Sequence, residues 1–129
     1  WPVRLFTGDF MLMTGRVGDI RNKEGLYAHI QRGAKGVGAH MGSMAGWKPD
    51  GWHLFVANWR RDALEFSVDG APPVRSPLPE PLPETPAPGF RVVLNSPTDE
   101  TIAMDELMVL DIALTSEEIA RLWKDGPSR

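Results

Sequence analysis

The sequence predicts an all-β fold, an antiparallel two-sheet sandwich with one short C-terminal helix. Apolar and polar residues alternate over several short runs, which is the pattern of half-buried strands. Thirteen Gly and twelve Pro in 129 residues indicate many turns and are too many for a helical bundle. The length fits a single domain over residues 1–129 with one hydrophobic core.

The strand pattern is clearest at residues 63–68. Leu64, Phe66 and Val68 share one face, and the intervening residues are mostly polar. Asp69-Gly70 follows and predicts a tight turn, because both residues tolerate positive φ. Further strands are expected at Phe10–Thr14, Gly25–Gln31, Gly36–His40, Trp52–Trp59, Phe90–Leu94 and Thr101–Leu110. The strand Trp52–Trp59 is nearly all apolar, so Trp52 is expected in the core.

A helix is expected from Thr115 to Lys124. Thr115 and Glu118 form a capping box. Ile119, Leu122 and Trp123 then make a narrow apolar stripe that can dock on a sheet, with Trp123 as its anchor.

Eight of the twelve prolines lie between Pro72 and Pro88. Because proline cannot donate a backbone hydrogen bond to a central strand, this stretch predicts a long, stiff surface loop. The alternative is a ligand for a proline-reading module.

Composition excludes several classes of function. The net charge of −3, without any Lys or Arg run longer than two, argues against a nucleic-acid partner. The lack of cysteine excludes a disulfide scaffold, thiol catalysis and a Cys-ligated zinc site. No apolar stretch approaches the roughly 20 residues that span a bilayer, so the chain is not expected to be membrane-embedded. Because it opens on Trp1, we expect a processed or excised product.

Three segments, in order, resemble one family. They are Gly51–Ala57 (GWHLFVA), Leu64–Gly70 (LEFSVDG) and the closing segment Ile102–Ile119, which contains DELMVLDIALTSEEI. Together they resemble the laminin G-like jelly rolls of the concanavalin A-like lectin/glucanase superfamily. The resemblance implies a two-sheet jelly roll that lacks the family's opening strands.

The resemblance leaves three functions open. The first is a non-catalytic module for binding or adhesion, with a carbohydrate or protein ligand, in a larger extracellular or cell-surface protein. The second is a structural spacer or assembly domain beside a catalytic domain. The third is a glycoside hydrolase, which needs two carboxyl groups about 5–5.5 Å apart, or wider for inversion. Asp105 and Glu106 are adjacent on the expected strand and would point to opposite faces, so an enzyme is not expected.

Aromatic residues are the candidate ligand contacts. Trp47 lies in a loop rich in Gly and Pro, where it either stacks on a ligand or folds back as a lid on the core. Trp59 and Tyr27 lie on strands and can face either side.

Asp105 is the candidate metal ligand. On the expected strand it shares a face with the apolar residues Leu107 and Val109. Its carboxylate is therefore expected to be buried. Such a group needs either amide donors from a neighbouring loop or a cation, and a structural calcium ion suits its oxygen atoms.

The missing opening strands predict an unpaired edge on the strand Thr101–Leu110. Natural proteins cover such edges. We therefore expect a segment or chain outside these residues to cover it. The alternative is that Trp1–Phe6 folds back and serves as the neighbouring strand.

Overall fold

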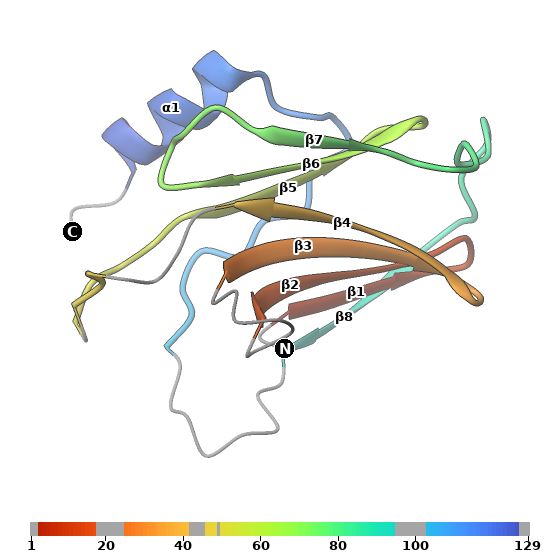
Figure 1. Cartoon of the computed structure of the whole chain (residues 1–129), viewed down its shortest axis with the longest axis horizontal. Helices are drawn as coiled ribbons and strands as arrows, with labels where there is room; N and C mark the ends of the chain where they lie inside the picture. Colours follow the sequence, from red (N-terminus) through yellow and green to blue (C-terminus); the bar gives the residue numbers. More distant parts are fainter. Residues whose placement is uncertain (1–2, 18–24, 42–45, 49, 95–102, 127–129) are drawn as a thin grey trace.

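The computed structural model describes the chain except residues 1–2, 18–24, 42–45, 49, 95–102 and 127–129. It confirms the all-β antiparallel sandwich: a five-stranded sheet of order β4-β3-β2-β1-β8 faces a three-stranded sheet of order β5-β6-β7 (Figure 1). The strands are β1 Val3–Thr7, β2 Met11–Val17, β3 Gly25–Arg32, β4 Lys35–Met41, β5 Phe55–Trp59, β6 Ala63–Val68, β7 Val74–Pro77 and β8 Phe90–Leu94, and the helix is α1 Ser116–Asp125.

The core lies between the two sheets. The five-stranded sheet contributes Leu5, Leu12 and Ile30, and the three-stranded sheet contributes Leu64 and Phe66. The last two are fully buried. Full burial of each such side chain stabilises the fold by about 1.5–3 kcal/mol. Because side chains alternate along a strand, the neighbouring positions on β2 and β3 point away from the core.

The turn after β6 confirms the prediction from Asp69-Gly70. Asp69 has φ 53° and Gly70 has φ 74°. The amide of Ala71 donates to the carbonyl of Val68 at 3.1 Å, which closes the turn. Positive φ at both central residues matches the type I′ turn that suits the twist of a hairpin.

The helix also forms as predicted. Thr115 Oγ1 accepts the amide of Glu118 at 3.2 Å, and the Glu118 carboxylate accepts the amide of Thr115 at 2.7 Å. The helix packs on the outer face of the three-stranded sheet (Figure 1), where Ile119 is fully buried. Trp123 packs against the turn at Gly70.

β7 lies where no strand was predicted, and β1 lies where a strand was only the alternative. β7 forms inside the proline-rich stretch and pairs with β6, from Phe66 opposite Val74 to Ala63 opposite Pro77. This is possible because β7 is an edge strand and its proline stands at its end, where a missing amide costs least. β1 pairs with β2 and β8, so residues near the N-terminus do become a strand, but not beside the segment 101–110.

The predicted strand Thr101–Leu110 is wrong for the residues that the structure describes. Residues 103–110 have no strand pairing and are exposed, and residues 101–102 lie outside the described part. Glu106 has φ 52°, which interrupts an extended backbone. β8 occupies the place beside β1 at the edge of the five-stranded sheet, so β1 does not pair with this segment.

The predicted burial of Asp105 is therefore also wrong. Its side chain is exposed. Leu107 and Val109, which were expected on the same buried face, are exposed as well. The carboxylate of Asp105 accepts the amide of the next residue, Glu106, at 2.9 Å. This short local bond does not need a buried environment.

Candidate functional site

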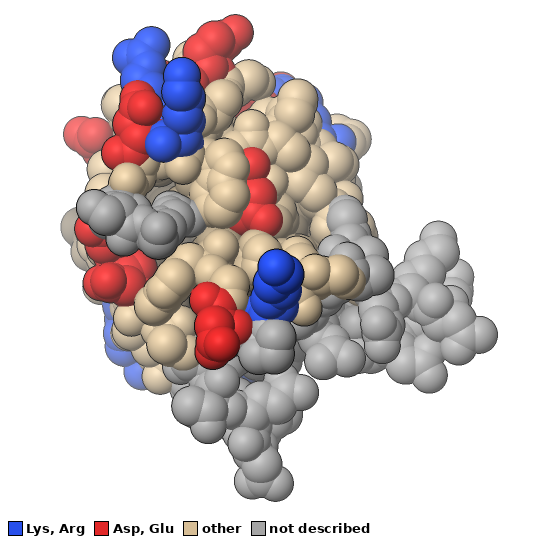
Figure 2. Space-filling view, turned by 90° about the vertical axis from the view of Figure 1, so that its left-hand side faces the viewer, with Lys and Arg blue, Asp and Glu red and all other residues tan. Residues whose placement is uncertain are grey.

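One end of the sandwich gathers several of the residues of interest. It is the end at the left of Figure 1, where β5 begins, β6 ends in the Asp69-Gly70 turn, and residues 50–54 lead into β5. Figure 2 shows this end face on: acidic and basic side chains both occur, some of them side by side, among uncharged surface. The surface therefore has no block of one charge that would select a strongly charged ligand.

A hydrogen-bonded pair of side chains fixes the approach to β5. His53 Nδ1 lies 2.7 Å from Asp69 Oδ2. The other carboxylate oxygen of Asp69 accepts the amide of Leu54 at 2.9 Å, and the amide of Asp69 donates to the Leu54 carbonyl at 2.9 Å. The turn that follows β6 thus holds the residues before β5 through three contacts.

Trp47 packs on this pair. Its indole lies parallel to the His53 imidazole, with 3.4 Å between ring centroids and 6° between planes, and its centroid is 6.1 Å from that of Phe55. Trp47 is half-buried and packs against the core, as expected of a lid, the alternative to ligand stacking. One face of the indole is already occupied by His53, so a ligand can use only the rest of the ring.

His53 has one polar atom without a partner. Its Nε2 is buried and makes no hydrogen bond within the described residues. A Cβ on Gly51 would lie 3.2 Å from this nitrogen, so the backbone at Gly51 covers it closely. The pair with Asp69 resembles the base and orienter of a catalytic dyad, but its outer nitrogen is closed off from a substrate. We interpret the pair as an anchor for the loop.

Trp52 was predicted in the core, and that prediction is wrong. Its side chain is 48% exposed. The reason is that β5 begins only at Phe55, so Trp52 precedes the strand and has no opposing layer. Because side chains alternate along an extended backbone, Trp52 lies on the side opposite to His53, which is anchored to Asp69.

The other two predicted ligand contacts lie elsewhere. Trp59 ends β5 at the opposite end of the sandwich, half-buried, with its ring centroid 5.9 Å from that of Phe10. Tyr27 is on β3 near the Trp47 end, but it is only 3% exposed and stacks with His40 at 5.8 Å. Burial raises the pKa of the Tyr27 phenol above its usual value. The structure does not bring Tyr27, Trp47 and Trp59 into one surface.

No group of three or more His, Cys, Asp or Glu side chains with metal-binding geometry occurs in the described ranges. Asp105 is not part of such a group. Calcium binding at Asp105 stays a prediction.

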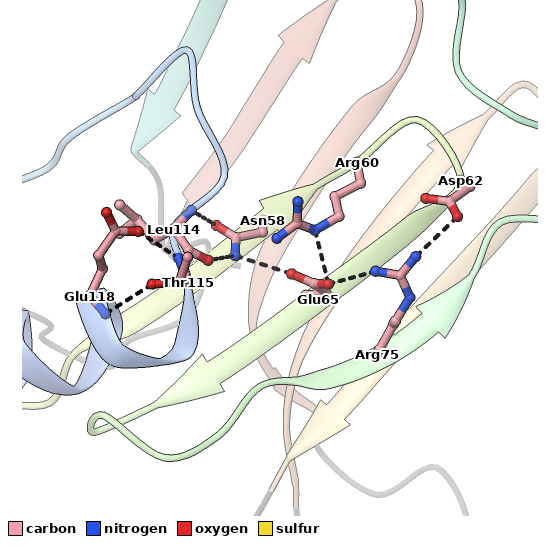
Figure 3. A network of polar contacts seen from close by, with 8 residues as sticks. All are labelled: Asn58, Arg60, Asp62, Glu65, Arg75, Leu114, Thr115 and Glu118. Atoms are coloured by element: carbon pink, nitrogen blue, oxygen red, sulfur yellow. Dashed lines mark hydrogen bonds and ion pairs between the residues drawn. The ribbon is translucent and has the colours of Figure 1, made fainter.

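A second polar cluster lies on the outer face of the three-stranded sheet (Figure 3). Glu65 receives hydrogen bonds from Arg60 at 2.9 Å, from Arg75 at 2.7 Å and from Asn58 at 3.2 Å. Burial tends to raise the pKa of Glu65, but these three donors outweigh burial and hold its pKa below the usual value. The carboxylate is fully engaged, so we assign the cluster to stability rather than to catalysis.

The same cluster ties the helix to the sheet. Asn58 is 6% exposed, and its amide group bonds both backbone groups of Leu114, donating to the carbonyl at 2.8 Å and accepting the amide at 3.1 Å. Leu114 immediately precedes the cap of α1. Asn58 therefore sets where the helix starts on the sheet.

The described helix is too short and too polar to cross a membrane. Comparison with protein-family models, curated proteins and solved structures found no match for this chain. The assignment of a function therefore rests on the fold and on the arrangement of these residues.

Proposed function

We propose that this chain is a non-catalytic binding module of a larger extracellular or cell-surface protein, with a carbohydrate as its ligand. The ligand would contact the end of the sandwich that carries Trp52 and Trp47. The observation that carries the proposal is the 48% exposure of Trp52 directly beside the anchored His53.

The physical chemistry of this end favours stacking. An exposed indole offers a large flat apolar face with few rotatable bonds, so a sugar ring can pack on it at a small cost in entropy. The three contacts between Asp69 and residues 53–54 hold the adjacent backbone before any ligand arrives. Such preorganisation lowers the cost of ordering the loop on binding. A protein ligand would use the same exposed indole.

The proposal is tested by retention on insoluble polysaccharides, with and without added Ca²⁺. We expect Trp52→Ala to abolish retention and Trp47→Ala to weaken it, because the indole of Trp47 is half-covered. Phe90→Ala is a matched control, since Phe90 is an aromatic residue that is 60% exposed at the opposite end. Retention that survives Trp52→Ala, or that Phe90→Ala removes equally, would refute this binding end. Loss of retention on removing Ca²⁺ in wild type but not in Asp105→Asn would support the calcium prediction.

A second candidate function is assembly, and the uncovered apolar surface favours it. The segment after residue 102 is exposed although it is rich in apolar side chains: Met104, Leu107, Met108, Val109, Leu110 and Ile112 are 36–64% exposed. Phe90 and Leu94 of β8 are also more than half exposed. The register of β1 and β8 places both side chains on the same face of the sheet as Leu5, and Leu5 points at the core. The three-stranded sheet does not reach this far.

We propose that a strand from outside these residues covers this surface, either from the same parent protein or from another chain. Static light scattering of the chain alone should then show association that rises with concentration. The variant Leu107→Ser/Met108→Ser should associate less, because it removes exposed apolar side chains without touching the core. A monomer at all concentrations for both proteins would contradict this role.

A further inference from the structure

The outer edge of β8 has no neighbouring strand among the described residues. β8 is the last strand of the five-stranded sheet and pairs only with β1, as its place at the border of the sheet in Figure 1 shows. Within the described part of the chain, the backbone groups of β8 that point away from β1 therefore have no strand to bond. Such an edge is a template for pairing with another chain.

The other three edges of the two sheets are protected in ways that β8 is not. β4 lies against β7, where the hydroxyl of Ser76 donates to the carbonyl of Gly38 at 3.0 Å. β7 also contains Pro77, which cannot donate to an added strand. On β5, Asn58 bonds the backbone of Leu114, so the chain that leads into α1 lies against this strand. β8 contains no proline, and no such bond reaches it from the described ranges.

The side chains of β8 that face the core side are only partly covered. Phe90, Val92 and Leu94 share this face with Leu5. Val92, in the middle, packs against the core. Phe90 and Leu94, at the two ends, are 60% and 53% exposed. The strand therefore carries an exposed apolar side chain on each side of a covered one.

β8 is complementary to a second copy of itself in one register. A two-fold axis perpendicular to the sheet makes two β8 strands antiparallel and keeps their core-side faces together. With Val92 on the axis, Phe90 lies opposite Leu94 of the second copy, and Leu94 lies opposite the second Phe90. Each exposed side chain then gains an apolar cross-strand partner, which stabilises the pairing.

The charge on β8 selects the same register. Arg91 projects from the opposite face, where its guanidinium carbon lies 4.7 Å from the ring centroid of Phe6. With Val92 on the axis, Arg91 lies opposite Val93 of the second copy and meets no like charge. A register with Arg91 on the axis would instead place two arginines directly opposite each other, which is destabilising. No other residue of β8 is charged.

We propose that β8 pairs with β8 of a second copy of this chain, antiparallel and with Val92 on the two-fold axis. The two five-stranded sheets then join edge to edge. This inference rests on the assembly role proposed above and names its partner. Because only five residues of each copy pair, the dimer should be in reversible equilibrium with the monomer.

The test uses single-cysteine variants, since the chain itself has no cysteine. Phe90→Cys and Leu94→Cys are purified separately, mixed in equal amounts and oxidised with diamide. Opposite residues of an antiparallel pair have Cα atoms about 4.5–5.5 Å apart, within the range of about 4.4–6.8 Å that a disulfide bridges. In either variant alone the two cysteines are four residues out of register, about 13 Å along the strand. The mixture should therefore form a disulfide-linked heterodimer, while each variant alone stays largely monomeric on a non-reducing gel.

The outcomes separate the register from chance collisions. Both substituted side chains are more than half exposed, so neither change removes core packing, and circular dichroism checks that each variant folds. No heterodimer in the mixture would overturn the proposal. Cross-linking of either variant alone to the same extent as the mixture would also overturn it.

The same experiment distinguishes this partner from the assembly role on which it rests. If the mixture forms no heterodimer, but wild type still associates in light scattering and Leu107→Ser/Met108→Ser associates less, the pairing of β8 is refuted and the assembly role stands. If wild type and that variant are both monomeric at all concentrations, both proposals fail.

Discussion

At the scale of single residues, Asp69 and Gly70 do more than close a turn. The Asp69 carboxylate orients His53 and fixes the amide of Leu54, while its own backbone takes positive φ. Gly70 supplies the second positive φ and the space in which Trp123 of the helix packs. One dipeptide thus connects the hairpin, the loop that carries the two tryptophans, and the helix.

Gly70→Ala should destabilise the protein by two separate effects. A left-handed conformation costs a residue with a Cβ roughly 1–2 kcal/mol. The new Cβ would also come within 2.8 Å of the Trp123 Cβ, which must move. The free energy of unfolding in urea should therefore fall by more than this conformational cost alone.

Gly33→Ala is the control for that experiment. Gly33 also has positive φ, 56°, but a Cβ there would meet no atom within 4 Å. It isolates the conformational cost. Equal losses in the two variants would show that Trp123 does not pack on Gly70.

Asn58→Ala should cost about 1–3 kcal/mol, because it leaves the amide and carbonyl of Leu114 without their partner. Gln31→Ala provides a comparison, since the Gln31 amide bonds the carbonyl of Gly33 in an exposed position. This substitution should change the free energy of unfolding by no more than about 0.5 kcal/mol. Thermal unfolding that ranks the two variants in the opposite order would refute the role given to Asn58.

At the scale of elements, the strands and helix with a complete local pattern were predicted correctly. β6 alternates through five positions and ends in Asp69-Gly70, and α1 begins with a capping box, so neither needs information from distant residues. β7 was missed because it lies in the proline-rich stretch, which argues against a strand, although an edge strand tolerates a proline at its end. Residues 103–110 were predicted as a strand because their apolar and polar residues alternate. Such alternation indicates which residues would share a face, but it does not show that a neighbouring strand is present.

The candidate site was predictable only in part. Trp47 was identified from its loop, but its stacking partner was not. The pairing of His53 with Asp69 joins residues 16 apart, and it depends on the register of the β5–β6 hairpin. That register pairs Phe55 with Val68, so one step further brings Leu54 beside Asp69. The Trp-His and Asp-Gly dipeptides at the two ends of one hairpin were the available signal.

The stability of the three-stranded sheet should depend on pH through Glu65. Its pKa is lower in the folded protein than the value of 4.5 for a free side chain. The folded state therefore binds a proton less readily than the unfolded state. The stabilisation is complete above about pH 4.5 and is lost as the pH falls through the folded pKa.

Glu65→Gln should remove this part of the pH dependence and lower stability at pH 7 by about 1 kcal/mol, because Arg60 and Arg75 lose their carboxylate. Urea denaturation at pH 7, 5, 4 and 3 measures both effects. Glu84→Gln is a matched control, since the Glu84 side chain is 77% exposed and forms an ion pair with Arg61. If the free energy of unfolding of Glu65→Gln changed with pH as steeply as that of wild type, the role given to Glu65 would be contradicted.

At the scale of the whole molecule, the two layers of the sandwich are unequal. The five-stranded sheet extends beyond the three-stranded sheet at β8, and the segment from 103 to 112 lies outside both. The apolar surface left there is made of other residues than Trp47 and Trp52. A binding role and an assembly role can therefore coexist in this fold, one at each surface.

The central claim is that a ligand binds at the Trp52 end, and the indole N–H signals of the five tryptophans test it most directly. Their ¹H–¹⁵N spectrum should be recorded while a soluble fragment of the retained polysaccharide is added. The account predicts a large shift for Trp52, a smaller one for Trp47, and none for Trp59 or Trp123. Binding that shifts Trp59 or Trp123 while Trp52 stays unchanged would contradict it.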